Sequence, residues 1–171
     1  MIETPNTTDL FVTWADLHRE TRQLVERLLR GDAGRGPWRG IVAITRGGMV
    51  PAAVIARETN IRLIETLSVA NYDGQKQGAL KVLAEPPQAV RDRGVGWLVV
   101  DDIVDSGRTA QAARGLLPEA AIVTLYSKPG ATKFVDLYLH LARDDQWVHF
   151  PWDTADRAGN PVFQPPMGEA E

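Results

Sequence analysis

The fold follows from the stretch Val99-Val100-Asp101-Asp102-Ile103-Val104-Asp105-Ser106-Gly107-Arg108-Thr109. The apolar run from Trp97 to Val100 predicts a short buried strand, because it is rich in β-branched residues, too short for a helix and preceded by a glycine. Two carboxylates follow this run, and a turn of small residues leads into a helix predicted over 110–117. Backbone N–H groups converge where such a helix begins, so the stretch predicts a phosphate site with acids in front of it.

Length and composition favour one globular domain over residues 1–171. The chain has 44% hydrophobic and 24% charged residues, close to ordinary globular usage. Its formal net charge of −3 argues against broad binding to nucleic acid or to an anionic membrane, which needs a basic face. We therefore expect any affinity for phosphate to be local.

The residue types exclude several classes of site. The sequence contains no cysteine, so it has neither disulfides nor a cysteine nucleophile, and a reducing cytoplasm fits. We find no secretory signal at the N-terminus and no apolar run near the roughly 18 residues of a membrane helix. We expect a cytoplasmic protein without a transmembrane segment.

Strands and helices are predicted to alternate along the chain. Thr13 and Asp16 resemble a capping box in front of an amphipathic helix over 14–30. Polar residues 71–78 predict a mobile loop or hairpin tip. The other predicted elements are strands at 40–44, 62–69, 81–83 and 121–126, a strand or sheet edge at 134–140, and a helix at 50–58.

This alternation predicts an α/β fold with a mostly parallel sheet and helices on both faces. Ligands bind such sheets beyond the carboxyl ends of the strands. Three predicted strands run into polar, glycine-containing turns, at 45–48, 101–109 and 127–130. We expect the three turns to line one cleft.

The chemistry of these turns points to a phosphorylated sugar. Adjacent acids such as Asp101 and Asp102 suit a sugar diol and Mg²⁺. The turn behind them suits a monophosphate, and Arg46 beside Gly47 offers donors for a second anionic group. The stretch matches neither a Walker A loop, nor a dinucleotide fingerprint, nor a calcium loop.

Residues 99–109 resemble the phosphoribosyl-diphosphate (PRPP) signature of type I phosphoribosyltransferases: two apolar residues, two acids, two apolar residues, then acid, Ser or Thr, Gly and Thr. The resemblance extends over roughly 11–153 to the bacterial members that act on 6-oxopurines. It is carried by Val12-Thr13-Trp14, Thr45 to Pro51, Leu80 to Leu83, Ser127-Lys128-Pro129 and Gln146 to Asp153.

The resemblance implies a type I phosphoribosyltransferase fold with a mobile lid at about 71–81 and a small purine-binding hood. It implies transfer of ribose 5-phosphate from PRPP to N9 of xanthine, guanine or hypoxanthine, with Mg²⁺, giving XMP, GMP or IMP and pyrophosphate in purine salvage. It also implies a homotetramer and, for some relatives, peripheral association with the inner membrane.

The resemblance assigns roles residue by residue. Asp105 is the catalytic candidate facing purine N7, and Asp102 is the metal ligand. Purine binding falls to Asp105, Lys128 at the 6-oxo oxygen, Trp147 stacking on the base, the Val148 backbone at the 2-substituent, and Asp153. PRPP binding falls to Arg46, Gly47, Asp101, Asp102, Ile103, Val104, Asp105, Ser106, Gly107, Arg108 and Thr109.

Two positions depart from the family pattern. The lid carries Gly78 where related enzymes have an arginine, with Lys76 and Lys81 nearby. The purine loop, 147–153, carries His149 in place of an acid, and an irregular tail is predicted over 154–171.

Other interpretations stay open at this stage. Residues 45–48 alone would be a routine turn, Lys128 an exposed turn lysine, and Trp147 a core or subunit contact. A PRPP-sensing regulatory protein of the same fold is the alternative function, and adenine or a pyrimidine is the alternative base.

Overall fold

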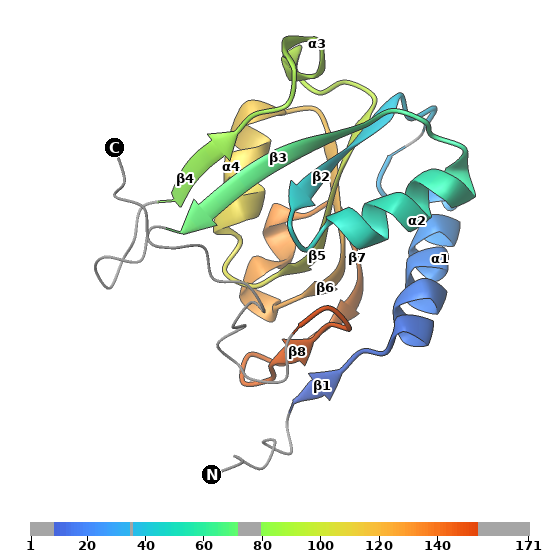
Figure 1. The fold of residues 1–171 in the computed structure, drawn as a ribbon, viewed down its shortest axis with the longest axis vertical. Helices are drawn as coiled ribbons and strands as arrows, with labels where there is room; N and C mark the ends of the chain where they lie inside the picture. The colour runs from blue at the N-terminus through green and yellow to red at the C-terminus, as the bar shows by residue number, and fades with distance from the viewer. Residues whose placement is uncertain (1–8, 35, 72–79, 154–171) are drawn as a thin grey trace, which may run out of the picture.

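The computed structural model describes residues 9–34, 36–71 and 80–153 (Figure 1). The helices are α1 (Trp14–Arg30), α2 (Met49–Thr59), α3 (Gln88–Arg91) and α4 (Arg108–Leu116), with a 3₁₀ helix η1 (Pro129–Phe134). The strands are β1 (Leu10–Phe11), β2 (Gly40–Thr45), β3 (Ile64–Asn71), β4 (Leu80–Ala84), β5 (Trp97–Val104), β6 (Ala121–Ser127), β7 (Leu137–Leu141) and β8 (Val148–His149).

Six strands form the central sheet in the order β4-β3-β2-β5-β6-β7. All neighbouring strands are parallel except β3 and β4, which pair antiparallel as the two arms of a hairpin. The prediction of a mostly parallel sheet is confirmed. Its two central strands, β2 and β5, carry the first two of the predicted turns at their carboxyl ends.

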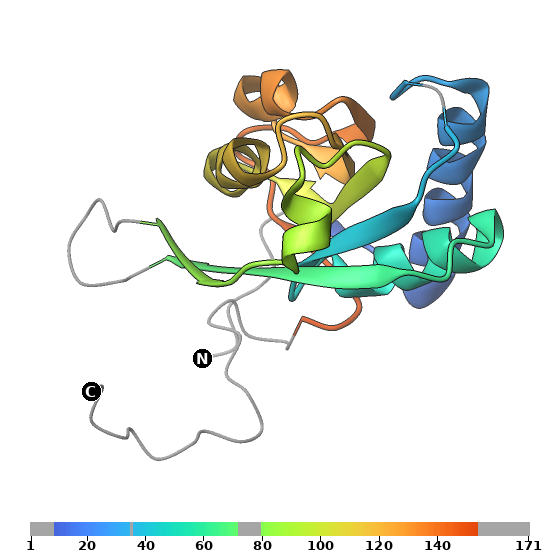
Figure 2. The ribbon, with the colours of Figure 1, turned by 90° about the horizontal axis from the view of Figure 1, so that it is seen from above.

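Helices cover both faces of the sheet, with α1 and α2 on one side and α3, α4 and η1 on the other (Figure 2). Successive side chains of a strand point to opposite faces. Leu98 and Val100 therefore join the core under α1 and α2, whereas Trp97 and Val99 join the core under α4. Burial on both faces explains why β5 begins as an unbroken apolar run.

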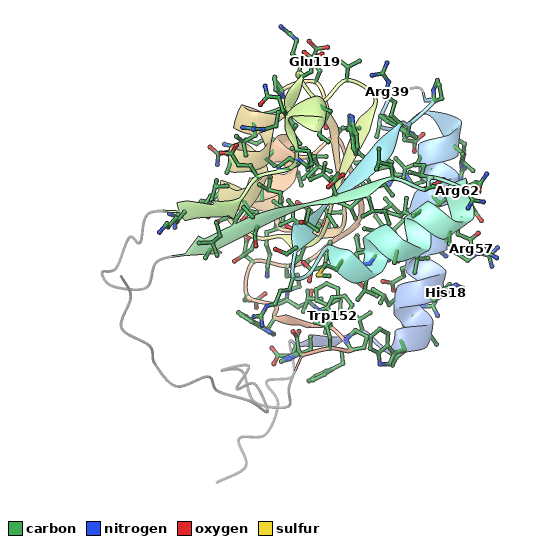
Figure 3. The ribbon with its side chains drawn as sticks, turned by 45° about the horizontal axis from the view of Figure 1, so that its top comes forward. His18, Arg39, Arg57, Arg62, Glu119 and Trp152 are labelled. Atoms are coloured by element: carbon green, nitrogen blue, oxygen red, sulfur yellow. The ribbon has the colours of Figure 1, made fainter. Side chains whose placement is uncertain are left out.

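Helix α1 has the residue range that the sequence predicts. The Thr13 hydroxyl accepts from the Asp16 N–H at 3.1 Å, and the Asp16 carboxylate accepts from the Thr13 N–H at 3.2 Å, which completes the capping box. His18 lies on the outward side of the helix (Figure 3).

Two strand boundaries differ from the prediction by three residues or more. Strand β5 continues to Val104 instead of ending at Val100, because its pairing with β6 carries on from Asp101↔Thr124 to Val104↔Ser127. The two acids are therefore part of the strand. Strand β7 begins at Leu137, because η1 occupies the preceding residues, and it forms the sheet edge.

A second, two-stranded sheet was not predicted. Strands β1 and β8 pair in parallel beyond the carboxyl ends of β5, β6 and β7 (Figure 1). Val12, Val148 and Phe150 bury its inner side against the main core. Within the described ranges, no helix combines the length and apolar character needed to cross a membrane.

Candidate active site

The turn between β5 and α4 depends on Gly107. This residue has φ +80°, a left-handed conformation that side chains disfavour, and a Cβ placed there would collide with the Phe134 ring. Gly107 caps α4 without a side-chain hydrogen bond, and the first turn of α4 contains no acid. The N-terminal N–H groups of the helix are therefore suited to an external anion.

A cavity of about 160 Å³ lies at this helix start. It is lined by Asp101, Ile103, Val104, Asp105, Ser106, Gly107, Arg108, Thr109 and Ala110. Eight of these nine residues belong to the set predicted to bind PRPP, and only Ala110 lies outside it. The sequence prediction of a phosphate site therefore corresponds to a real concavity.

Asp101, which is buried, and Asp102, which is half-buried, form an interacting pair on β5. Burial raises the pKa of Asp101 well above its usual range, and the neighbouring Asp102 charge raises it further. Burial also raises the pKa of Asp102, and the Asp153 charge adds to this effect. A cation or a sugar diol at this position would relieve the unfavourable burial of negative charge.

The glycine turn after β2 packs against this acid pair. A Cβ at Gly47 would overlap the Asp102 carboxylate, and one at Gly48 would overlap the Val100 carbonyl oxygen. The start of α2 has neither a side-chain cap nor an acid in its first turn, like the start of α4. Two of the three predicted turns therefore meet at Asp102, with the Arg46 side chain exposed beside them.

A second cavity, of about 310 Å³, lies between the end of β5 and the small sheet. It is lined by Asp9, Ile103, Asp105, Lys128, Asp144, Asp145, Gln146, Trp147 and Val148. Ile103 and Asp105 line both cavities, so the two are adjacent. Four of the five residues predicted to bind a purine, Asp105, Lys128, Trp147 and Val148, surround this space.

Lys128 forms part of one wall of the larger cavity. Its backbone N–H donates to the Val104 carbonyl at 2.9 Å, which places the third predicted turn beside the end of β5. Its side chain is 7% exposed, and Nζ donates to the carbonyl oxygens of Arg143 at 2.5 Å, Asp144 at 3.3 Å and Gln146. Lys128 is therefore not an exposed turn lysine.

The small sheet forms the opposite wall. The N–H groups of Leu10 and Val12 donate to the Trp147 and His149 carbonyls, each at 2.8 Å. Because alternate residues of a strand direct their backbone groups to opposite edges, the Val148 N–H and C=O point away from β1. Trp147 lines the cavity with its side chain 54% exposed, which leaves a ring face available for stacking.

The sequence analysis missed Asp9. The Asp9 carboxylate lies 3.1 Å from His149 Nε2, and its side chain is only 4% exposed. The His149 ring also stacks on Phe11, with centroids 4.4 Å apart. No local signal marks Asp9, because only the β1–β8 pairing brings it to the cavity. Asp144, Asp145 and Gln146 were also missed, because the contacts of Lys128 with the carbonyls of their loop come from a residue distant in sequence.

Asp153 does not line either cavity. Its carboxylate accepts from the Phe150 N–H at 2.8 Å, and the neighbouring Trp152 ring stacks on Phe150 with centroids 5.0 Å apart (Figure 3). A role of Asp153 in purine binding stays a prediction. Most of the expected lid, including Lys76 and Gly78, lies outside the described residues, as does the predicted tail at 154–171. Lys81 is exposed on β4.

Comparison with known proteins defines the class. A family model described as "Phosphoribosyl transferase domain" matches residues 13–158, and the chain belongs to this family. A solved structure of a purine phosphoribosyltransferase from Pyrococcus horikoshii shares the fold with a TM-score of 0.72, at 22% identity and over 93% of this chain and 99% of that one. The fold is the type I phosphoribosyltransferase fold.

Curated relatives are more specific. A xanthine-guanine phosphoribosyltransferase of Chromohalobacter salexigens is 48% identical over 142 residues, covering 83% of this chain and 82% of the relative. Another protein of that name, from Gluconobacter oxydans, is 49% identical over 162 residues, covering 94% of this chain and 90% of the relative.

Proposed function

We propose that the protein transfers ribose 5-phosphate from PRPP to N9 of a 6-oxopurine, as its curated relatives are named for doing. The observation that carries the proposal is that the phosphate-type cavity and the larger cavity meet at Ile103 and Asp105. A nucleotide needs this arrangement, with its phosphate and its base in adjoining spaces joined by a ribose. Purine salvage follows as the biological role.

The smaller cavity and the two glycine turns hold PRPP in this proposal. Residues 106–109 and the start of α4 bind the 5′-phosphate through backbone N–H groups. Asp101 and Asp102 accept from the ribose hydroxyls. Arg46 and Gly47 face the pyrophosphate, and the Arg46 guanidinium stabilises the charge that develops on it as it leaves.

The donor set fits Mg²⁺. This ion is commonly bound by one or two carboxylates together with substrate phosphates. No group of three or more metal-binding side chains occurs in the described part of the chain, but the pair of Asp101 and Asp102 supplies two carboxylates whose mutual repulsion a cation relieves. Asp102 is the proposed ligand, and the ion would supply charge stabilisation to the leaving pyrophosphate.

The larger cavity takes the base. A purine stacked on Trp147 would direct its 6-oxo oxygen to Lys128 and its 2-position to the Val148 backbone. Since all three donors of Lys128 already serve backbone carbonyls, one of these bonds has to be shared or exchanged when the 6-oxo oxygen arrives.

Asp105 is the proposed catalytic residue. The N9–C1′ bond forms as the bond from C1′ to the pyrophosphate oxygen breaks, and the imidazole ring of the base must then lose its proton. The Asp105 carboxylate lines both cavities and accepts this proton at N7. Water has to be kept out of the site while the ribose carbon is electron-poor.

The test is a product assay with PRPP, Mg²⁺ and each of guanine, xanthine, hypoxanthine, adenine and orotate. We expect GMP, XMP and IMP, with pyrophosphate released in equal amount, and no product from adenine or orotate. Absence of product from every 6-oxopurine, with PRPP still bound, would instead support the PRPP-sensing alternative.

The homotetramer and the cytoplasmic location implied by the resemblance are part of the proposal. Analytical ultracentrifugation tests the first, and fractionation of the source cells tests the second. Peripheral membrane association has no structural argument in its favour within the described residues.

A further inference from the structure

The larger cavity is unusually rich in hydrogen-bond acceptors. Four of its nine lining residues are aspartates, namely Asp9, Asp105, Asp144 and Asp145. Among the described lining residues, Lys128 is the one with a cationic side chain, and it directs its donors to three backbone carbonyls. Away from Lys128, the cavity walls therefore favour N–H groups of a base over its oxygen atoms.

Asp9 stands apart from the other three aspartates because of its burial and its place in the small sheet. The register pairs Leu10 with Val148 and Phe11 with His149, so Asp9 lies one position earlier, across from Trp147. Strand alternation puts Asp9, Trp147 and His149 on the same face of this sheet. A base stacked on Trp147 consequently presents an edge to Asp9.

The other contacts decide which edge this is. In the proposed complex the 6-oxo oxygen faces Lys128, N7 faces Asp105, and N9 faces the ribose cavity. The edge that contains C2 is the one left for the small sheet, where the Val148 backbone groups point away from β1. Asp9 and Val148 both line the cavity, Asp9 from next to β1 and the Val148 backbone from the outer edge of β8.

His149 holds the Asp9 carboxylate in place. The 3.1 Å contact with Nε2 and the stacking of the imidazole on Phe11 restrict both side chains. A carboxylate has about four lone-pair sites, so Asp9 can accept from more than one donor at the same time. The pair thus presents a fixed acceptor to the base.

We propose that Asp9 is a specificity residue that accepts from the 2-amino group of the base and makes guanine a better substrate than xanthine. This inference rests on the proposed function. Xanthine carries an oxygen at the 2-position, which faces the Asp9 carboxylate with no proton between them, whereas guanine supplies an N–H donor. Hypoxanthine carries only a hydrogen atom at the 2-position, so its kcat/KM should not depend on Asp9.

The experiment measures kcat/KM for guanine, xanthine and hypoxanthine in the wild-type protein and in Asp9→Asn. The amide has the shape of the carboxylate but can donate to an oxygen. We expect the guanine-to-xanthine ratio to fall by about tenfold or more, as loss of a hydrogen bond to a charged group implies. The kcat/KM for hypoxanthine should stay within about twofold of the wild-type value.

Asp144→Asn is the matched control, because it removes a carboxylate from the same cavity but outside the small sheet. This variant should change kcat/KM for guanine and for xanthine by the same factor. His149→Gln, which keeps a donor toward Asp9, should preserve more of the guanine preference than His149→Leu.

The outcomes separate the two proposals. If hypoxanthine is used but Asp9→Asn leaves the guanine-to-xanthine ratio unchanged, or Asp144→Asn shifts it equally, the role of Asp9 is wrong and the proposed function stands. If wild-type protein uses none of the three bases, both are overturned.

Discussion

Gly47 packs directly against the carboxylate of Asp102, so closely that no room for a Cβ is left between the β2 turn and the acid pair of β5. The proposed pyrophosphate site and the proposed ribose site are therefore built as one unit. Because the colliding atoms are the end of a side chain, a larger residue at position 47 can be accommodated only by moving the carboxylate.

We expect Gly47→Ala to fold and to raise the KM for PRPP by about tenfold or more, because the displaced Asp102 loses charge-assisted contacts to the ribose and its cation. Steady-state kinetics with PRPP as the varied substrate checks this. In Gly115→Ala, a Cβ meets nothing within 4 Å, so KM should not change. Gly48→Ala should lower stability instead, because its Cβ meets the Val100 backbone. An unchanged KM in Gly47→Ala would contradict the shared site.

Asp105→Asn should lower kcat by about 10² or more, within the usual range for acid–base catalysis, while PRPP affinity changes little. The asparagine keeps the shape of the side chain but is a poor proton acceptor. Stopped assays for kcat and equilibrium binding of PRPP separate the two effects. A variant with wild-type turnover would remove Asp105 from the proton transfer.

Lys128→Met should lower the free energy of unfolding by about 1–3 kcal/mol, because the buried ammonium no longer satisfies the carbonyls of the loop at 143–146. The loop carries Gln146 and leads into Trp147, so kcat/KM for the base should also fall. Urea denaturation and purine kinetics measure these effects. Lys133→Met, at an exposed position, is the control. It should change the free energy of unfolding and kcat/KM for the base much less than Lys128→Met does. Equal effects in the two variants would show that Lys128 is an ordinary lysine.

The α1 capping box should make stability depend on pH at the acid end. The pKa of Asp16 is lowered from 3.8 to about 2, chiefly by the Thr13 hydroxyl and then by Arg19. A group whose pKa is lower in the folded state stabilises the protein above its unfolded pKa, and this contribution disappears as the pH falls from about 4 to about 2. Urea titrations at these pH values should show a smaller loss in Asp16→Asn than in wild type or in Glu26→Gln. Equal losses in all three would contradict this.

Much of the fold could be predicted because its signals are local. The Thr13 and Asp16 pair predicted the start of α1, and the apolar run at Trp97 predicted β5. The boundaries were less accurate, since β5 continues through Asp101 and Asp102 only by pairing with β6. Pairing depends on a neighbour distant in sequence, which a local pattern does not contain.

In the candidate site, too, some features follow from local sequence and others from contacts between distant residues. By itself the sequence determined the stretch proposed to bind PRPP, because strand, acids, glycine turn and helix start are consecutive residues whose chemistry is set by their order. Only the tertiary structure decided that Asp9 reaches the larger cavity and that Lys128 is saturated by backbone carbonyls. Asp9 and His149 are separated by 140 residues. Their meeting depends on a parallel pairing of two short strands, which burial of Val148 and Phe150 stabilises and which neither strand specifies alone.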